Sequence, residues 1–360
     1  TGGWQDPKAI HLMAEALKLA SADRGPYVGD PDFYDVPMAG LLSEEYATQR
    51  AALIDLGAAI VPTRETPAGN PYPFMEPPIG APDGEESPST THISVLDEAG
   101  NAVAITQTIS SFWGSQDMIP GYGFFMNNEF HNFNSYNPDQ PDAVNVVAPY
   151  KRPRTVLAPT VVRNPEGEVV LVIGTPGAGR IPSTVVQTIV NVIDFGMELE
   201  DAIAAPKFTS RVGYQVLHME GGYSEETIAA LEALGHQVDN NHGVLDYFFG
   251  GINAIIVKDG LMTGVGSFRR AGGAAGWEGR GHRLEPLLRG ISFSGCRPPR
   301  GAGEQLETTM GLHRGDTMHK RPGSILTLAL ILAAGSSLTE PGSLAAQSPT
   351  FGSPAFIASV

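Results

Sequence analysis

The sequence is poor in cysteine and in positive charge. Cys296 is the one cysteine among 360 residues, which excludes an internal disulfide and a cysteine-based metal site and is equally compatible with cytoplasm and periplasm. Lys and Arg number 23 against 39 Asp and Glu, so the net charge is −16. Nucleic acid and anionic membranes repel an acidic surface, and we expect neither as a partner.

Membrane-length apolar runs and metal-ligand spacings are also missing. The apolar run at 324–334 is shorter than a membrane span, so we expect no stable span. No H-x-x-x-H or H-x-H spacing occurs among His92, His131, His218, His236 and His242. We therefore expect no metal site and no cofactor. The glycines at 174–179 are spaced G-x-x-G-x-G without a Gly-Lys-Ser/Thr, which argues against nucleotide binding.

The apolar periodicity predicts a mixture of helices and strands. Asp6-Pro7 reads as the start of an amphipathic helix that ends near Arg24-Gly25, and Ser43 opens a second helix through about Leu56. Later strands are expected at 155–162, 169–173 and 251–257, and helices at 185–195 and after Ser224.

A hairpin follows a proline-rich segment. Residues 61–88 hold eight prolines and no periodicity, which predicts a linker or exposed loop. Ile93 and Val95 then alternate with polar residues, 97–101 supplies a turn, and 102–109 resumes as a second strand. Thr90, at the junction of loop and strand, is the candidate nucleophile, released by self-cleavage after Ser89.

A freed Thr90 would carry both the nucleophilic hydroxyl and the base that activates it. A threonine hydroxyl needs an adjacent base, and an α-amino group titrates near ~7.7–8.0, so the new amine can accept the proton. Thr108, on the paired strand, is placed to hold the hydroxyl, and the backbone N–H groups of Gly177 and Ala178 suit an oxyanion hole. The alternative interpretation is a purely structural Thr-Thr pair. The polar cluster at 127–132 is likewise either a hydrogen-bonded turn or a substrate clamp.

Several motifs in a fixed order resemble one family. They are Thr90-Thr91-His92-x-Ser94-Val95-x-Asp97-x-x-Gly100-Asn101-Ala102-Val103, Pro120-Gly121-x-Gly123, Asn127-Asn128-Glu129, Lys151-Arg152-Pro153, Pro159-Thr160, Gly174-x-Pro176-Gly177-x-x-Arg180-Ile181 and, upstream, Ala22-Asp23-Arg24 and Gly29-Asp30-Pro31-Asp32-Phe33. Together they resemble the γ-glutamyltransferases from about residue 5 to Trp277.

The resemblance implies an N-terminal-nucleophile hydrolase fold. This is an α+β, four-layer αββα sandwich, here incomplete at the N-terminus, whose precursor cleaves itself into a large and a small subunit. It implies transfer of a γ-glutamyl group from glutathione-like donors to water or to an amine or peptide acceptor, in the periplasm or outside the cell. By position, Thr90 is the nucleophile with Thr108 beside it, and Gly177 and Ala178 form the oxyanion hole. The substrate-binding positions are Ser110, Glu129, Asn132, Thr155 and Val156.

Departures from the family pattern fall mostly at the substrate-binding positions, with one in the oxyanion hole. Asn132 stands where Asp is common, Thr155-Val156 replace a Ser-Ser pair, Ser110 replaces Asn, and Ala178 replaces Gly. Loss of a carboxylate weakens a contact to the substrate ammonium. An acylase acting on another amide, such as a poly-γ-glutamate or a β-lactam side chain, therefore stays open.

The resemblance also divides the chain. We expect residues 1–60 to be the end of the large subunit, 61–89 a linker ending at the cleavage site, and 90–277 the small, catalytic subunit. Residues 278–360 form an irregular tail with a signal-peptide-like segment at 318–346, which we exclude from the fold. Residues 1–4 resemble an interior cut, with the family's carboxylate-binding arginine upstream. An inactive remnant is therefore a further alternative.

Overall fold

The computed structural model describes residues 3–61, 65–72, 89–134, 143–277 and 355–359. Its α-helices are α1 Pro7–Tyr27, α2 Met38–Leu41, α3 Glu44–Ala51, α4 Ile181–Ile193, α5 Leu199–Ala204 and α6 Glu225–Ala233. Its 3₁₀ turns are η2 Glu129–Asn132, η3 Ala178–Arg180, η4 Tyr247–Phe249 and η5 Phe268–Arg270. Its strands are β1 Ser89–Asp97, β2 Ala102–Ser110, β3 Thr160–Arg163, β4 Val169–Gly174, β5 Phe208–Thr209, β6 Leu217–Met219, β7 Val238–Asp239, β8 Asn253–Lys258, β9 Leu261–Gly266, β10 Gly273–Trp277 and β11 Ala355–Ser359. The expected α+β class is confirmed.

Side-chain caps start three of the helices as the sequence indicates. Asp6, Ser43 and Ser224 each accept a backbone N–H from the first turn of α1, α3 and α6. Helix ends were harder to predict. Helix α1 continues to Tyr27 through Pro26, beyond the expected Arg24-Gly25 end. Helix α3 stops at Ala51, before the expected Leu56.

Other boundaries also differ from the expected ones. Strand β3 starts at Thr160 rather than at 155, and α4 starts at Ile181 rather than at 185. Helix α5 and strands β9 and β10 were not expected, because their short runs carry no clear period. Strand β11, from the tail that we excluded from the fold, pairs with both β1 and β10.

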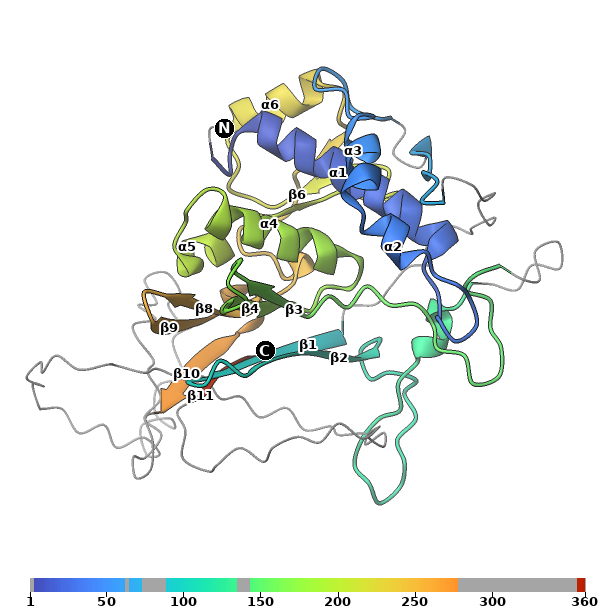
Figure 1. Cartoon of the computed structure of the whole chain (residues 1–360), viewed down its shortest axis with the longest axis vertical. Coiled ribbons are helices and arrows are strands. Elements are labelled where there is room, and N and C mark those ends of the chain that lie inside the picture. Colours follow the sequence, from blue (N-terminus) through green and yellow to red (C-terminus); the bar gives the residue numbers. More distant parts are fainter. Residues whose placement is uncertain (1–2, 62–64, 73–88, 135–142, 278–354, 360) are drawn as a thin grey trace, which may run out of the picture.

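Two antiparallel four-stranded sheets form the centre of the molecule. Their orders are β10-β11-β1-β2 and β3-β4-β8-β9, and a small sheet β5-β6-β7 lies apart. Figure 1 shows the β3-β4-β8-β9 sheet between α4 and α5 on one face and the β1 sheet on the other. Among the described residues, no helix covers the outer face of the β1 sheet.

Separate apolar clusters hold these layers together. Leu96 packs with Val172 and Ile255 between the two sheets, and Ile181 and Val185 of α4 pack on the β4–β8 face. A third cluster joins α1 to β5, β6 and α6, and comprises Ile10, Ala14, Phe208, Leu217, Met219 and Leu231. Burial of such side chains contributes about 1.5–3 kcal/mol each.

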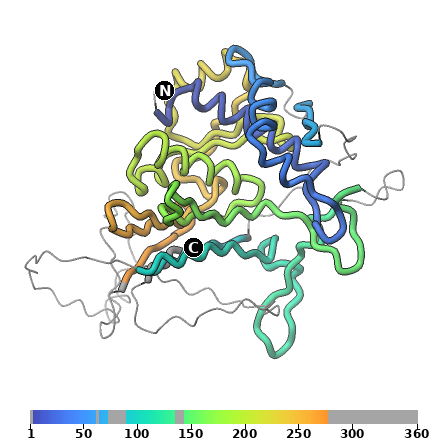
Figure 2. Tube along the Cα trace, in the orientation of Figure 1, coloured from blue at the N-terminus to red at the C-terminus, as the bar shows by residue number. Residues whose placement is uncertain are grey.

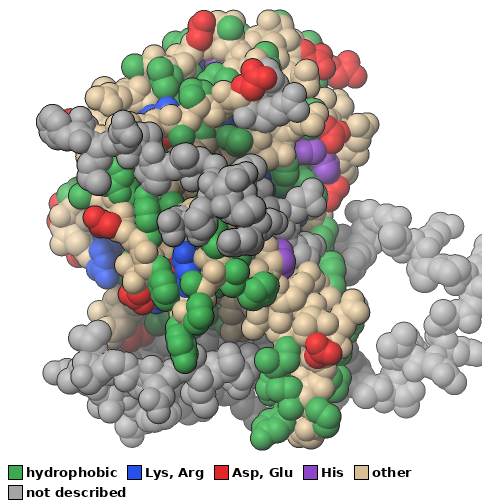
Figure 3. All heavy atoms as spheres, turned by 90° about the vertical axis from the view of Figure 1, so that its right-hand side faces the viewer, with side chains coloured by type: hydrophobic (Ala, Val, Ile, Leu, Met, Phe, Trp, Pro, Cys, Tyr) green, Lys and Arg blue, Asp and Glu red, His purple; other side chains and the backbone are tan. Residues whose placement is uncertain are grey.

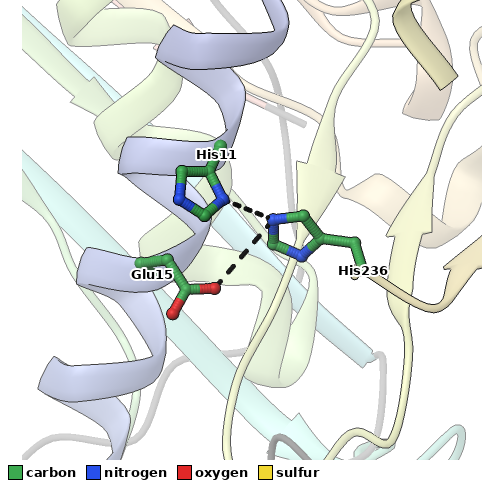
Figure 4. A group of neighbouring side chains, drawn as sticks. All are labelled: His11, Glu15 and His236. Atoms are coloured by element: carbon green, nitrogen blue, oxygen red, sulfur yellow. Dashed lines mark hydrogen bonds and ion pairs between the residues drawn. The ribbon is translucent and has the colours of Figure 1, made fainter. Parts of the chain in front are cut away.

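A buried polar joint also connects α1 with the segment after α6. Figure 4 shows His11, Glu15 and His236 converging, with His11 Nδ1 2.8 Å from His236 Nε2. The other ring nitrogen of His11 donates to the Asp55 carbonyl at 2.8 Å, and Lys18 donates to Glu15 at 2.7 Å. Burial lowers the pKa of His236 to about 3, so this ring is neutral. Regions before and after residue 89 thus lie side by side, as the blue and yellow tubes in Figure 2 show.

Candidate active site

One face of β1 carries the candidate nucleophile. His92, Ser94 and Leu96 are buried, and alternation places Thr90 on the same inward face. Thr90 is half-buried and pairs with Thr108 across the hairpin. Directly opposed residues have their Cβ atoms about 4.5–5.5 Å apart, so the two threonine side chains are neighbours. The pairing register shifts between Ser89 and Thr90, which is the expected scissile bond.

His92 fixes the distance between β1 and β4. A Cβ built on Gly174 would lie 2.3 Å from His92 Cε1, so the ring rests on the end of β4. Ser94 Oγ donates to the Asn253 carbonyl at 3.3 Å and accepts from His92 Nε2 at 2.9 Å. His92 Nδ1 then accepts from Thr106 Oγ1 at 2.7 Å. Burial lowers the pKa of His92 to about 4, in agreement with a neutral ring.

The same contacts set the direction of β1 over β4. Leu96 packs in one cluster with Val169 and Val172 of β4, whereas His92 lies against Gly174. Moving from Leu96 to His92 therefore runs toward the carboxyl end of β4. Two residues span about 7 Å of strand, so Thr90 continues past Gly174 toward the loop that begins at Thr175.

That loop has a strained and supported backbone. Gly177 has φ 144°, and Ala178 has φ 52°, a left-handed conformation uncommon for alanine. Thr175 Oγ1 donates to the Pro176 carbonyl at 2.7 Å and accepts Gly251 N–H at 2.9 Å. These bonds hold the peptide units of Gly177 and Ala178 in a fixed orientation, as an oxyanion-binding loop requires.

Arg180, the last residue of η3, anchors this loop from the other side. Arg180 N–H donates to the Gly177 carbonyl at 3.1 Å, and Arg180 Nε donates to the Phe248 carbonyl at 3.0 Å. A Cβ on Gly250 would lie 2.2 Å from the Pro176 carbonyl oxygen, so η4 packs directly against the loop. Replacing Gly250 by any other residue would displace the loop.

The expected clamp residues gather at the Thr90 end of the hairpin. Ser110, with φ 72° and a buried side chain, donates its N–H to Thr108 Oγ1 at 2.8 Å. Glu129 accepts hydrogen bonds from Asn132 and Ser110. Burial raises the pKa of Glu129, and these two hydrogen bonds oppose that shift. A half-buried carboxylate beside the threonine pair suits a substrate ammonium.

Thr155 and Val156 lie in different environments. Thr155 is exposed, whereas the Val156 side chain is buried in the α4 cluster. A contact from Val156 to substrate would therefore come from its backbone. The buried Asn145 ties this stretch to the clamp, because its side chain donates to the Asn132 carbonyl at 2.7 Å and accepts Arg154 N–H at 3.0 Å. Sequence inspection missed Asn145.

An ion pair links the upstream region to the same stretch. Arg152 N–H and Nε donate to the Asp30 carboxylate at 2.7 and 3.1 Å, and this contact holds the pKa of Asp30 below its usual range. The two motifs Gly29–Phe33 and Lys151–Pro153 thus meet in space. His92 and Thr175, which support the site, were not expected to do so, because sequence alone does not show which strands stack.

The site defines a class of protein. Neighbouring threonine hydroxyls at a strand end, a fixed backbone loop beyond that end and a half-buried carboxylate are typical of enzymes that transfer acyl groups from amides. Residues 1–277 match the family model of gamma-glutamyltranspeptidase. The chain belongs to this family.

The relatives of the chain include proenzymes named acylase and proenzymes named glutathione hydrolase. The chain is 38% identical over 271 residues to the Acylase ACY 1 proenzyme of Pseudomonas sp. (strain SE83), covering 75% of this chain and 44% of that protein. It is 36% identical over 271 residues to the Glutathione hydrolase proenzyme of Escherichia coli (strain K12), covering 73% and 43%. A solved cephalosporin acylase from Bacillus halodurans matches with TM-score 0.62 and 27% identity, over 77% of this chain and 46% of that one.

These matches cover less than half of each relative's own length. Of the helices that the structure describes, none has the length and hydrophobicity of a membrane-spanning segment.

Proposed function

We propose that this chain is the catalytic part of a self-processing amide hydrolase and acyltransferase that acts on γ-glutamyl substrates such as glutathione. The observation that carries the proposal is the position of Thr90. It lies at the register shift of the β1–β2 hairpin, on the inward face, and is directed along β1 toward the Gly177–Ala178 loop. The family's proenzymes support a chain that is cut before it acts.

Processing and turnover use the same hydroxyl. Thr90 Oγ attacks the carbonyl carbon of Ser89, the peptide nitrogen becomes the free α-amine of Thr90, and water hydrolyses the resulting ester. In turnover, that amine accepts the hydroxyl proton while Oγ attacks the substrate amide. The oxyanion accepts hydrogen bonds from Gly177 and Ala178 N–H, and the leaving amine departs with the proton. Water or an amine or peptide acceptor then takes the acyl group.

The clamp supplies substrate orientation. Glu129 and Asn132 bind the α-ammonium, Ser110 holds Glu129, and Thr155 with the Val156 backbone binds the α-carboxylate. Thr108 orients the Thr90 hydroxyl. No group in this scheme is a metal or cofactor.

A second candidate function is acylase activity on a non-glutamyl amide. Two observations favour it: the acylase names among the relatives, and Asn132, which contributes an amide where the family commonly has a carboxylate. A weaker ammonium site favours acyl groups without an α-amine, such as a glutaryl group.

The complete enzyme would add a fourth layer. Val103 and Ile105, on the outer face of β2, are both 46% exposed, and aliphatic side chains in a sheet are usually covered. We propose a four-layer αββα sandwich in which helices cover this face, with 1–60 the end of the large subunit, 61–89 the linker and 90–277 the small subunit. Residues 278–354 lie outside the described residues, and a periplasmic or secreted location stays a prediction.

The test compares wild type with Thr90→Ala and Thr90→Ser. Intact mass should show a new N-terminus at Thr90 in wild type and in Thr90→Ser, and none in Thr90→Ala. Hydrolysis of γ-glutamyl and glutaryl anilides then separates the two functions, since a glutaryl preference would overturn the γ-glutamyl assignment. Cleavage of Thr90→Ala at the same bond would refute the nucleophile.

A further inference from the structure

A second group of histidine and carboxylate side chains lies near η4, outside the reaction just described. His218 on β6 and Asp239 on β7 are paired directly in the parallel register of these strands. His242 follows Asp239 by three residues and turns back toward both. His218 Nδ1 lies 3.1 Å from Asp239 Oδ2 and 3.4 Å from His242 Nε2, and His242 Nε2 lies 3.7 Å from the same Asp239 oxygen.

These separations match those around a tetrahedral metal ion. Bonds of about 2.0–2.1 Å to nitrogen and oxygen place tetrahedral ligands about 3.3 Å apart, and the three observed separations lie on either side of that value. Two imidazoles and one carboxylate are a donor set that Zn²⁺ and its neighbours in the first transition row prefer. We propose that His218, Asp239 and His242 form a binding site for a divalent transition-metal ion, with Zn²⁺ as the reference ion.

Surrounding groups orient the three ligands. Asp239 Oδ1 accepts two hydrogen bonds from Asn241, which leaves Oδ2 directed at the histidines. Asp246 Oδ2 lies 3.7 Å from His242 Nδ1, on the side of the ring away from the ligand group. A carboxylate behind a ligating histidine is the usual outer partner of such sites.

The cluster is also accessible. The side chains of His218, Asp239 and His242 are 19%, 29% and 17% exposed, so an ion and a fourth, water ligand can reach them. The charged neighbours are Asp239 and Asp246, which attract a cation, and Arg180, which opposes it.

The buried joint of Figure 4 offers a contrast with the same residue types. There, Lys18 donates to the Glu15 oxygen that a metal would need, and Ile60 N–H donates to the other oxygen. All three of its members are buried, so a metal would meet a fixed cation with no route to water. Among the described residues, no lysine forms a hydrogen bond or ion pair with His218, Asp239 or His242.

The test uses the full chain, stripped with a chelator and titrated with Zn²⁺ by calorimetry. We expect one Zn²⁺ site per chain. The double variant His218→Ala/His242→Ala should lose this site, and Asp239→Asn should bind Zn²⁺ more weakly. Asp246→Asn should cost about 10- to 100-fold in affinity through the outer shell. His131→Ala, which removes an exposed histidine elsewhere, is the matched control and should leave that site unchanged.

Cobalt substitution reports the ligands directly. Co²⁺ bound to wild type should give the intense visible absorption of a four-coordinate site, and the double variant should not. Circular dichroism identifies a variant that fails to fold. If the double variant does not fold, the affinity of Asp239→Asn for Zn²⁺ provides the test, because asparagine keeps the size and shape of the aspartate side chain. No stoichiometric binding by folded wild type, or equal binding by the folded double variant, would overturn the proposal.

Discussion

Gly174→Ala tests the packing contact between the His92 ring on β1 and Gly174 at the end of β4. The new Cβ would lie 2.3, 2.4 and 2.7 Å from three ring atoms of His92. Gly174 is not among the residues with positive φ, so alanine adds a steric effect alone. Overpacking of this kind costs about 1–3 kcal/mol, and the contact involves a rigid buried ring, so we expect the upper half of that range.

Removing the ring should remove the clash. His92→Ala leaves a cavity and removes one hydrogen bond from each of the Ser94 and Thr106 hydroxyls, at a cost of about 2–4 kcal/mol. In that background the methyl of Gly174→Ala enters the vacated space and should cost less than about 1 kcal/mol. The coupling energy is therefore expected near 2 kcal/mol, within the range for residues in contact.

The assay is urea denaturation of the four proteins, each carrying Thr90→Ala so that one uncleaved species is measured. With Thr90 restored, Gly174→Ala should also slow processing, because it lifts Thr90 from the Gly177–Ala178 loop. Equal destabilisation by Gly174→Ala with and without His92 would refute this account of the β1–β4 contact.

Three other predictions concern the site and its pH dependence. Because burial raises the pKa of Glu129 and only the carboxylate binds an ammonium, KM should rise as pH falls through that pKa. In Glu129→Gln, KM should be roughly 10- to 100-fold higher and nearly independent of pH in this range. Ala178→Gly should keep full activity because φ 52° suits glycine, whereas Ala178→Val should lower kcat at least tenfold, since a β-branched residue resists that conformation. The pKa of His92 is about 4 in the folded chain and about 6.5 in the unfolded chain. As pH falls from 6.5 to 4, the unfolded chain therefore takes up a proton at His92 before the folded chain does, and the free energy of unfolding decreases. Between pH 7 and pH 4 this decrease should reach about 3 kcal/mol, measured by denaturation at each pH, and it should be smaller in His92→Ala.

Local signals predicted much of the fold. The caps Asp6, Ser43 and Ser224 and the β1–β2 alternation depend on neighbours in sequence, and all were found. Helix ends were missed because packing, not propensity, decides them. The extension of α1 through Pro26 is an example, with Tyr27 fully buried.

Contacts between distant segments could not be predicted in the same way. Two examples are the packing of His92 against Gly174 and the pairing of His218 with Asp239. Both depend on which strands lie next to one another and in which register. A search for H-x-x-x-H on one segment cannot find ligands on two strands and a loop. Site residues came instead from the family motifs, and their assigned roles stay predictions.

The N-terminus of the processed fragment decides whether Thr90 is the nucleophile. The chain, expressed in its full natural reading frame, is analysed by intact mass and N-terminal sequencing, alongside Thr90→Ala. We expect a fragment beginning Thr90-Thr91-His92 in wild type only. A different N-terminus, or the same fragment from Thr90→Ala, would contradict the assignment of Thr90 as the nucleophile.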